Sequence, residues 1–157
     1  MARRLLASGL LLCQAALTPA IIIPADLPEG LYTFPLDSVS PDTAISPQRR
    51  QRSWRATCGT SGPININDFA VAKENLQDAC DAGETYIPHM AVVYTTGTAV
   101  AYFCNYGAQN TCSRAEYDEA MLSLVQQCGI GAGGEVFDGN TKGYGGDTVV
   151  GADICVE

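Results

Sequence analysis

Apolar residues recur at helical spacing in two stretches of the chain. The first stretch follows Asn65 and Asn67, either of which can cap a helix, and it ends at Gly83. One face of this predicted helix carries the apolar side chains Phe69, Ala72, Leu76, Ala79 and Cys80.

The second helical stretch has the clearest boundaries. Ser113 and Glu116 have the spacing of a capping box, and Gly129 is a natural stop. Arg114 and Asp118 are placed to pair one turn apart. The predicted core-facing stripe consists of Tyr117, Ala120, Met121, Leu124, Val125 and Cys128.

Two runs rich in β-formers, 90–94 and 98–104, lie between these helices and are separated by Thr-Thr-Gly. Both runs are apolar on both faces at their centres, so we expect a central hairpin covered by helices. Further strands are predicted around 55–58 and over 148–156. The order β-α-β-β-α-β predicts an α+β fold: a small two-layer α/β sandwich of the split βαβ type, with about four strands and two helices.

The first 20 residues have the pattern of a signal peptide. Arg3 and Arg4 precede a short leucine-rich stretch, and cleavage is expected after Ala16 or Ala20. A membrane anchor is the alternative, because three isoleucines follow, but polar residues and a proline interrupt the apolar run, which would need about 20 residues to span a bilayer. No membrane span is expected once the signal peptide is removed.

Residues 21–52 are predicted to form a disordered pro-segment. Five of the chain's eight prolines fall here, and no strand or helical periodicity is present. The segment ends in a basic cluster, Arg49, Arg50 and Arg52, which a processing endoprotease of the Kex2 type would cut. A solvated linker is the alternative. The prediction is therefore a mature, cysteine-rich domain over 53–157.

Cysteine number points to an oxidising compartment. Of seven cysteines, Cys13 lies in the predicted signal peptide. The remaining even set predicts three disulfides in a secreted, extracellular domain, whose small hydrophobic core needs them for stability. The set consists of Cys58, Cys80, Cys104, Cys112, Cys128 and Cys155.

Six cysteines allow about 15 pairings, which sequence cannot distinguish. Position along the predicted elements suggests one set, and an alternative for two of its members. The suggested set is Cys104–Cys112, Cys80–Cys128 and Cys58–Cys155. The alternative replaces the last two with Cys58–Cys128 and Cys80–Cys155.

Charge narrows the partners of the predicted mature domain. Four basic residues stand against thirteen acidic ones, which leaves a net charge of −9. Such a surface repels phosphate backbones and anionic lipid, so we expect neither nucleic acid nor a membrane surface as a partner.

Motifs for chemistry are weak. The glycines of 129–134, continued to 151, match a nucleotide fingerprint by spacing but follow a helix rather than a strand, so we expect a loop of tight turns that is either functional or mobile. His89 is the only histidine, and oxidised cysteines offer neither a nucleophile nor a zinc ligand. Ser61 and Ser123 have no nucleophile context, and Ser113 is a cap. We assign no catalytic residue, no cofactor and no metal site.

Sugar-binding platforms have equally little support in the sequence. Carboxylates are abundant, so residue type alone allows a glycosidase pair. Trp54 stands alone near the start of the predicted mature domain, and we expect most tyrosines to pack in the core or at its rim.

Several short stretches together resemble a known group of proteins. They are Val100 to Tyr106, Cys112-Ser113 with Glu116-Tyr117, Cys128-Gly129, Tyr144-Gly145 and Ile154-Cys155. In this layout the chain is similar to small secreted cysteine-rich proteins of filamentous fungi, the necrosis-inducing effectors and killer-toxin-like proteins. The resemblance covers Cys58 to Cys155 and implies a disulfide-bonded α/β sandwich.

The function implied by the resemblance is that of a secreted, non-enzymatic effector or toxin-like protein acting on a host or competitor. Killer toxins of this type tend to be basic, whereas this domain is acidic, which favours recognition of an extracellular protein or glycan. The alternatives are a small secreted hydrolase or hydrolase inhibitor, and a cell-wall-associated structural protein.

Overall fold

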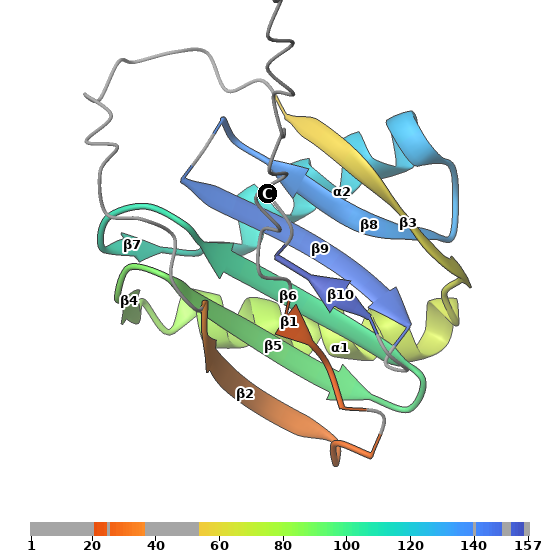
Figure 1. The fold of residues 1–157 in the computed structure, drawn as a ribbon, viewed down its shortest axis with the longest axis horizontal. Helices are drawn as coiled ribbons and strands as arrows, with labels where there is room; N and C mark the ends of the chain where they lie inside the picture. Colours follow the sequence, from red (N-terminus) through yellow and green to blue (C-terminus); the bar gives the residue numbers. More distant parts are fainter. Residues whose placement is uncertain (1–20, 25, 37–53, 140, 149–151, 156–157) are drawn as a thin grey trace, which may run out of the picture.

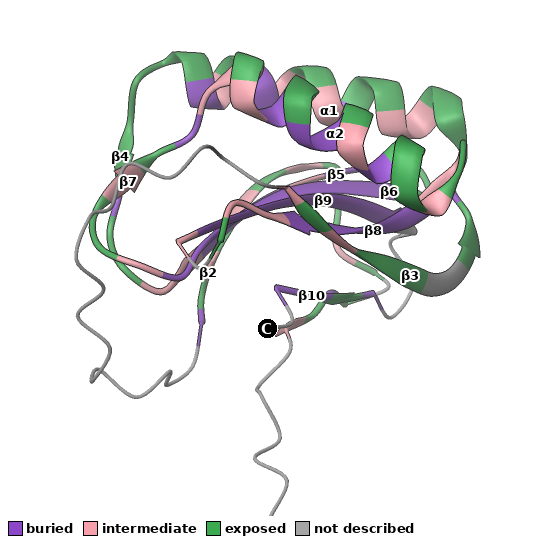
Figure 2. Cartoon of the chain, turned by 90° about the horizontal axis from the view of Figure 1, so that it is seen from above, coloured by how far each residue is buried: buried purple, intermediate pink, exposed green. Residues whose placement is uncertain are grey.

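The computed structural model describes residues 21–24, 26–36, 54–139, 141–148 and 152–155. The predicted signal peptide and the basic cluster at 49–52 lie outside the described residues. Within them, one sheet carries two helices on one face, and a short two-stranded pairing lies against its other face (Figures 1 and 2).

The main sheet of the described chain has six strands and is antiparallel throughout, in the order β2-β5-β6-β9-β8-β3. Its centre is made by two hairpins joined edge to edge. Their strands are β5 (Met90–Thr96), β6 (Ala99–Asn105), β8 (Ala132–Phe137) and β9 (Lys142–Thr148). The outer strands are β2 (Gly30–Pro35) and β3 (Arg55–Pro63).

Two short pairings complete the strands. One joins β1 (Ile21–Ile22) to β10 (Asp153–Ile154), and the other joins β4 (Thr85–Tyr86) to β7 (Asn110–Thr111). The strand expected over 148–156 is therefore wrong for the described residues: β9 ends at Thr148, and β10 pairs with β1 outside the main sheet.

The predicted fold class is also wrong. A four-stranded split βαβ sheet needs parallel neighbours, whereas every described pair here is antiparallel and the main sheet has six strands. Three unpredicted strands account for the difference. The glycine-rich segment forms β8 and β9 instead of a loop, and β2 adds a strand from the segment expected to be disordered.

Both predicted helices are confirmed. Helix α1 (Ile66–Asp81) begins after Asn65, whose side chain accepts hydrogen bonds from the amides of Asn67 and Asp68. Helix α2 (Arg114–Cys128) begins after Ser113, whose hydroxyl accepts from the Glu116 amide at 3.2 Å. These bonds satisfy amide groups that lack partners inside the helix.

The sheet separates two hydrophobic clusters. Under the helices, Leu76 and Tyr117 pack on Phe103 and Tyr144. The other face holds the second cluster, which includes Val93 and Tyr102 from the sheet together with residues from both ends of the described chain. The central hairpin is covered on both faces, as its sequence predicted: every residue of β6 is buried.

Glycines in β8 and β9 make room for large side chains from neighbouring elements. A Cβ at Gly145 would lie 2.2 Å from Cζ of Tyr102, and one at Gly146 would lie 2.1 Å from Cε2 of Phe69. Such distances are too short for any side chain, so glycine is required by packing and not by turn geometry. This explains a strand that lacks an apolar pattern of its own.

Residues near the start of the described chain belong to the core. Ile23 is fully buried and Leu36 nearly so, and both lie in the second cluster. The predicted disorder of 21–52 is therefore wrong for the described residues 21–24 and 26–36. Removal of the segment by a protease stays a prediction.

Three disulfides pair all six predicted framework cysteines: Cys58–Cys128, Cys80–Cys112 and Cys104–Cys155. The prediction of a disulfide-bonded domain is confirmed. The suggested pairing is wrong, because Cys112, just after β7, lies beside the end of α1, and Cys155, just after β10, lies beside β6. Of the three observed disulfides, only Cys58–Cys128 was included in the alternative set.

Candidate binding surface on the helices

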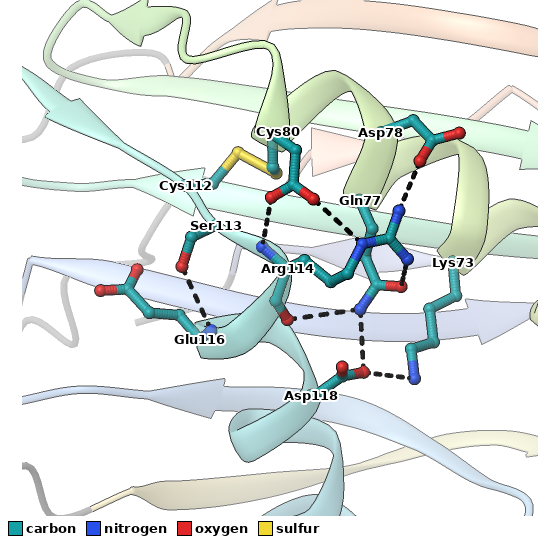
Figure 3. A network of polar contacts seen from close by, with 10 residues as sticks. Lys73, Gln77, Asp78, Cys80, Cys112, Ser113, Arg114, Glu116 and Asp118 are labelled. Carbon is teal, nitrogen blue, oxygen red and sulfur yellow. Dashed lines mark hydrogen bonds and ion pairs between the residues drawn. A yellow bond between two sulfur atoms is a disulfide. The ribbon is translucent and has the colours of Figure 1, made fainter.

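The outer face of the two helices carries a charged network centred on Arg114 (Figure 3). The guanidinium of Arg114 bonds to Asp81 at 3.0 Å through Nε, to Gln77 at 2.9 Å through Nη1, and to Asp78 through Nη2. Its backbone amide also donates to Asp81 at 3.1 Å. The first residue of α2 is therefore fixed to the last two turns of α1.

A second set of bonds continues the network along the helices. The side-chain nitrogen Nε2 of Gln77 donates to Asp118 at 2.8 Å, and Lys73 pairs with the same carboxylate at 2.6 Å. The predicted pair of Arg114 with Asp118 is wrong, since each of the two residues makes its contacts to α1 instead. Bonding across the helices satisfies both groups with partners already positioned by α1.

The network sets the ionisation of its carboxylates. The pKa of Asp81 is lowered, chiefly by the hydrogen bond from the Arg114 amide and then by the bond from its side chain. The pKa of Asp118 is lowered chiefly by the hydrogen bond from Lys73. Both carboxylates therefore stay charged in mildly acidic fluid.

The opposite end of the same face is apolar and exposed. The two helices are antiparallel, since Asp81 meets Arg114 at one end and the amide of Ile64 bonds to Gly131 O at the other, at 2.9 Å. Residues at the start of α1 and the end of α2 thus lie at one end of the helical layer. Four exposed apolar side chains lie in these parts, and we call them the apolar patch: the first residue of α1, two residues in the second half of α2 and one residue just after it, with the exposed fractions Ile66 62%, Leu122 59%, Val125 42% and Ile130 85%.

Val125 was expected on the core-facing stripe of α2, but it is exposed. Helical spacing places Val125 on the side of α2 that faces α1, as it does Arg114 and Asp118. The apolar patch and the charged network therefore follow one line along the boundary between the helices.

A buried ionic group lies beneath the start of α2. Lys142 donates to Glu116 at 2.9 Å and to the Thr111 carbonyl at 2.6 Å, and Tyr144 donates to Glu116 at 2.6 Å. The Lys142 side chain is only 10% exposed and that of Glu116 15%. Because the members satisfy one another, the group holds α2 to β9 and does not present a reactive atom.

Two further carboxylates are buried on the sheet face away from the helices. Glu135 accepts from Tyr106 at 2.6 Å, and Asp147 lies beside Gly59 and Gly133. Burial, and then the charges of Glu135 and Asp147, hold the pKa of Tyr102 well above its usual range. Tyr102 is therefore a neutral hydrogen-bond donor, and it bonds to Gly134 O at 3.1 Å.

The nearest approach to a metal-binding set among the described residues is Cys104, Cys155 and Glu135. The two sulfurs form a disulfide and so have no thiolate to offer a metal ion. This set therefore does not fit zinc or another thiophilic metal.

Residues singled out for chemistry are scattered. His89 has φ of 57°, precedes β5 and is half-buried, and its Nδ1 has no hydrogen-bond partner among the described residues. Ser113 caps α2, Ser123 accepts from Gln127 at 2.8 Å, and Ser61 lies in β3. The structure brings none of these together.

Most aromatic side chains pack inside the protein, as expected. Trp54 contacts Tyr144 edge to face at 5.9 Å between ring centroids. The buried tyrosines are Tyr86, Tyr102, Tyr106, Tyr117 and Tyr144.

The surface formed by α1 and α2 does not emerge from the sequence pattern of either helix alone. A signal was present: Lys73, Gln77 and Asp81 recur every four residues on α1, as Arg114 and Asp118 do on α2. Such polar lines beside a core-facing stripe are typical of two helices that lie side by side.

No helix in the described part of the chain is both long and apolar enough to cross a membrane. No family model, no curated protein and no solved structure matches this chain.

Proposed function

We propose that this chain is a secreted, non-enzymatic effector or toxin-like protein of a fungus, and that it binds an extracellular protein through the outer face of α1 and α2. The observation that carries the proposal is the apolar patch defined above, at one end of the charged network. Grouped apolar side chains with a charged border are typical of protein-binding surfaces.

Charge indicates the kind of partner. The same helices carry exposed carboxylates, among them Glu74 and Glu119. The basic residues of the two helices, Lys73 and Arg114, are already paired with carboxylates of this chain. The complementary partner therefore has an apolar centre and a basic border.

The disulfides support an extracellular partner. The three disulfides are compatible with an oxidising environment, in which such crosslinks persist. The resemblance to fungal effectors adds that the partner belongs to a host or a competing microbe.

The test is capture of a partner from host extracellular fluid by the oxidised protein, with two matched variants. Leu122→Asp places a charge in the apolar patch. Val71→Asp places the same charge at an exposed position of α1 about 140° around the helix from Ile66. We expect wild type and Val71→Asp to capture one stoichiometric protein with a basic surface, and Leu122→Asp to lose it. Capture that is equal for all three proteins would refute the proposed surface.

A further inference from the structure

The segment before the predicted processing site contributes a strand to the main sheet. Strand β2 pairs with β5 over six residues, from Gly30 opposite Thr95 to Pro35 opposite Met90. The ladder continues by one bond, from the Leu36 amide to His89 O at 2.8 Å. Because β2 is the outermost strand, its removal would leave the backbone groups of β5 unpaired along that edge.

Side chains of the same segment pack beside β5 on the apolar surface of the second cluster. Tyr32, Phe34 and Leu36 alternate along the strand and point to the sheet face away from the helices, where Leu36 is buried and Phe34 packs on the second cluster. Upstream, Ile23 is fully buried, and its amide bonds to Ala152 O at 3.1 Å. The segment is therefore held by both backbone and side chains.

No disulfide reaches this segment. The first bonded cysteine is Cys58, and all three crosslinks join residues from 58 to 155. A cut between 36 and 54 would sever the only covalent link between β2 and the sheet to which it belongs.

We infer that the edge of β5 is a strand-binding site, and that residues 21–36 of this chain are its resident peptide, which stays bound without a covalent link after cleavage. The ligand class is an extended peptide with large apolar side chains at alternate positions. Backbone bonds to β5 supply affinity, and packing on the second cluster selects the side chains, as in other cases of strand addition. This site is separate from the surface proposed on the helices.

The first experiment cuts the chain by design. A recognition sequence for a site-specific protease replaces residues 48–52 in the secreted protein, so the result does not depend on natural processing. After cutting, we expect both fragments in one peak on native size exclusion, and two bands on a denaturing, non-reducing gel. Elution of the short peptide by itself, or unfolding of the cut protein, would overturn the inference.

The second experiment uses peptides added in trans to test whether the strand-binding site selects side chains. A labelled peptide of residues 21–36 in excess should exchange into the cut protein. The Phe34→Asp peptide should bind at least ten-fold more weakly than the Leu31→Asp peptide, because Leu31 lies on the exposed side of the same strand. Equal binding of the two peptides would show that the strand-binding site does not select side chains, and would overturn the inference.

Discussion

Gly146 tests whether the glycine-rich segment is a packed strand. A Cβ at this position would lie 2.1 Å from Cε2 and 2.7 Å from Cζ of Phe69, which reaches down from α1. Either the ring or the helix must shift. Overpacking of this kind costs about 1–3 kcal/mol, so we expect Gly146→Ala to lower the free energy of unfolding by that amount.

A double-mutant cycle separates this contact from other effects. In the Phe69→Ala background the obstacle is absent, and alanine in a strand is favoured over glycine by about 0.5–1 kcal/mol. The cost of Gly146→Ala should therefore vanish or change sign, giving a coupling energy of at least about 1 kcal/mol. The contrast is Gly139→Ala, at a glycine with φ of 92° and open space around it, whose cost comes from backbone strain and should not depend on Phe69.

The assay is urea unfolding followed by far-UV circular dichroism with the disulfides intact. The slopes against urea should agree among the variants, so that midpoints report stability. If Gly146→Ala were neutral in the wild-type background, or if its effect added to that of Phe69→Ala, the packing explanation of the glycines would be refuted.

Three further predictions concern charge. Burial is the main cause that raises the pKa of three tyrosines, Tyr102, Tyr117 and Tyr144. The stability that they contribute is fully present below the ordinary tyrosine pKa of about 10 and falls above it by about 1.4 kcal/mol per pH unit for each of them. Tyrosinate absorbance should reach its full value only with loss of circular dichroism, and full ionisation of all tyrosines in a folded protein would contradict this. Arg114→Ala should lower the urea midpoint at low salt, and lower it less at high salt, because its ion pairs are partly exposed and salt screens them. An equal loss at both salt concentrations would speak against an ionic contribution. Lys142→Ala should cost about 3–5 kcal/mol, because it removes a cationic partner from the buried carboxylate of Glu116. A thermal midpoint close to that of wild type would argue against this.

The sequence predicted elements whose signals are local. Asn65 and Ser113 each bond to amides within three residues, so the two helix starts depend on neighbours along the chain. The hairpin of β5 and β6 is likewise defined by two apolar runs and one turn. In each case the residues that decide the structure are close in sequence.

Strands β8 and β9 could not be predicted in this way. Their glycines carry no apolar pattern, because the side chains that fill the space come from distant elements: Tyr102 from β6 and Phe69 from α1. A single sequence offers no means to know which large residue will lie over which glycine. The disulfide pairing failed for the same reason, since Cys104 and Cys155 meet only after β10 has folded beneath the sheet.

The disulfides predict where this protein opens first. One crosslink joins β3 to the end of α2, one joins the end of α1 to the segment before α2, and one joins β6 to the chain just after β10. They close loops of 70, 32 and 51 residues, each worth about 4 kcal/mol in the chain-entropy treatment.

Strand β2 has no such crosslink and only one neighbour in the sheet. No disulfide therefore restrains its opening, which exposes little beyond the surface that it covers on β5 and the second cluster. In native-state hydrogen exchange, we expect the amides of β2 that bond to β5 to exchange well before those that join β5 to β6. After reduction of the disulfides this difference should shrink, because the rest of the sheet loses the restraint that β2 never had. Protection of β2 equal to that of the central strands in the oxidised protein would mean that the segment opens only with the whole domain, and that the crosslinks do not set the order of opening.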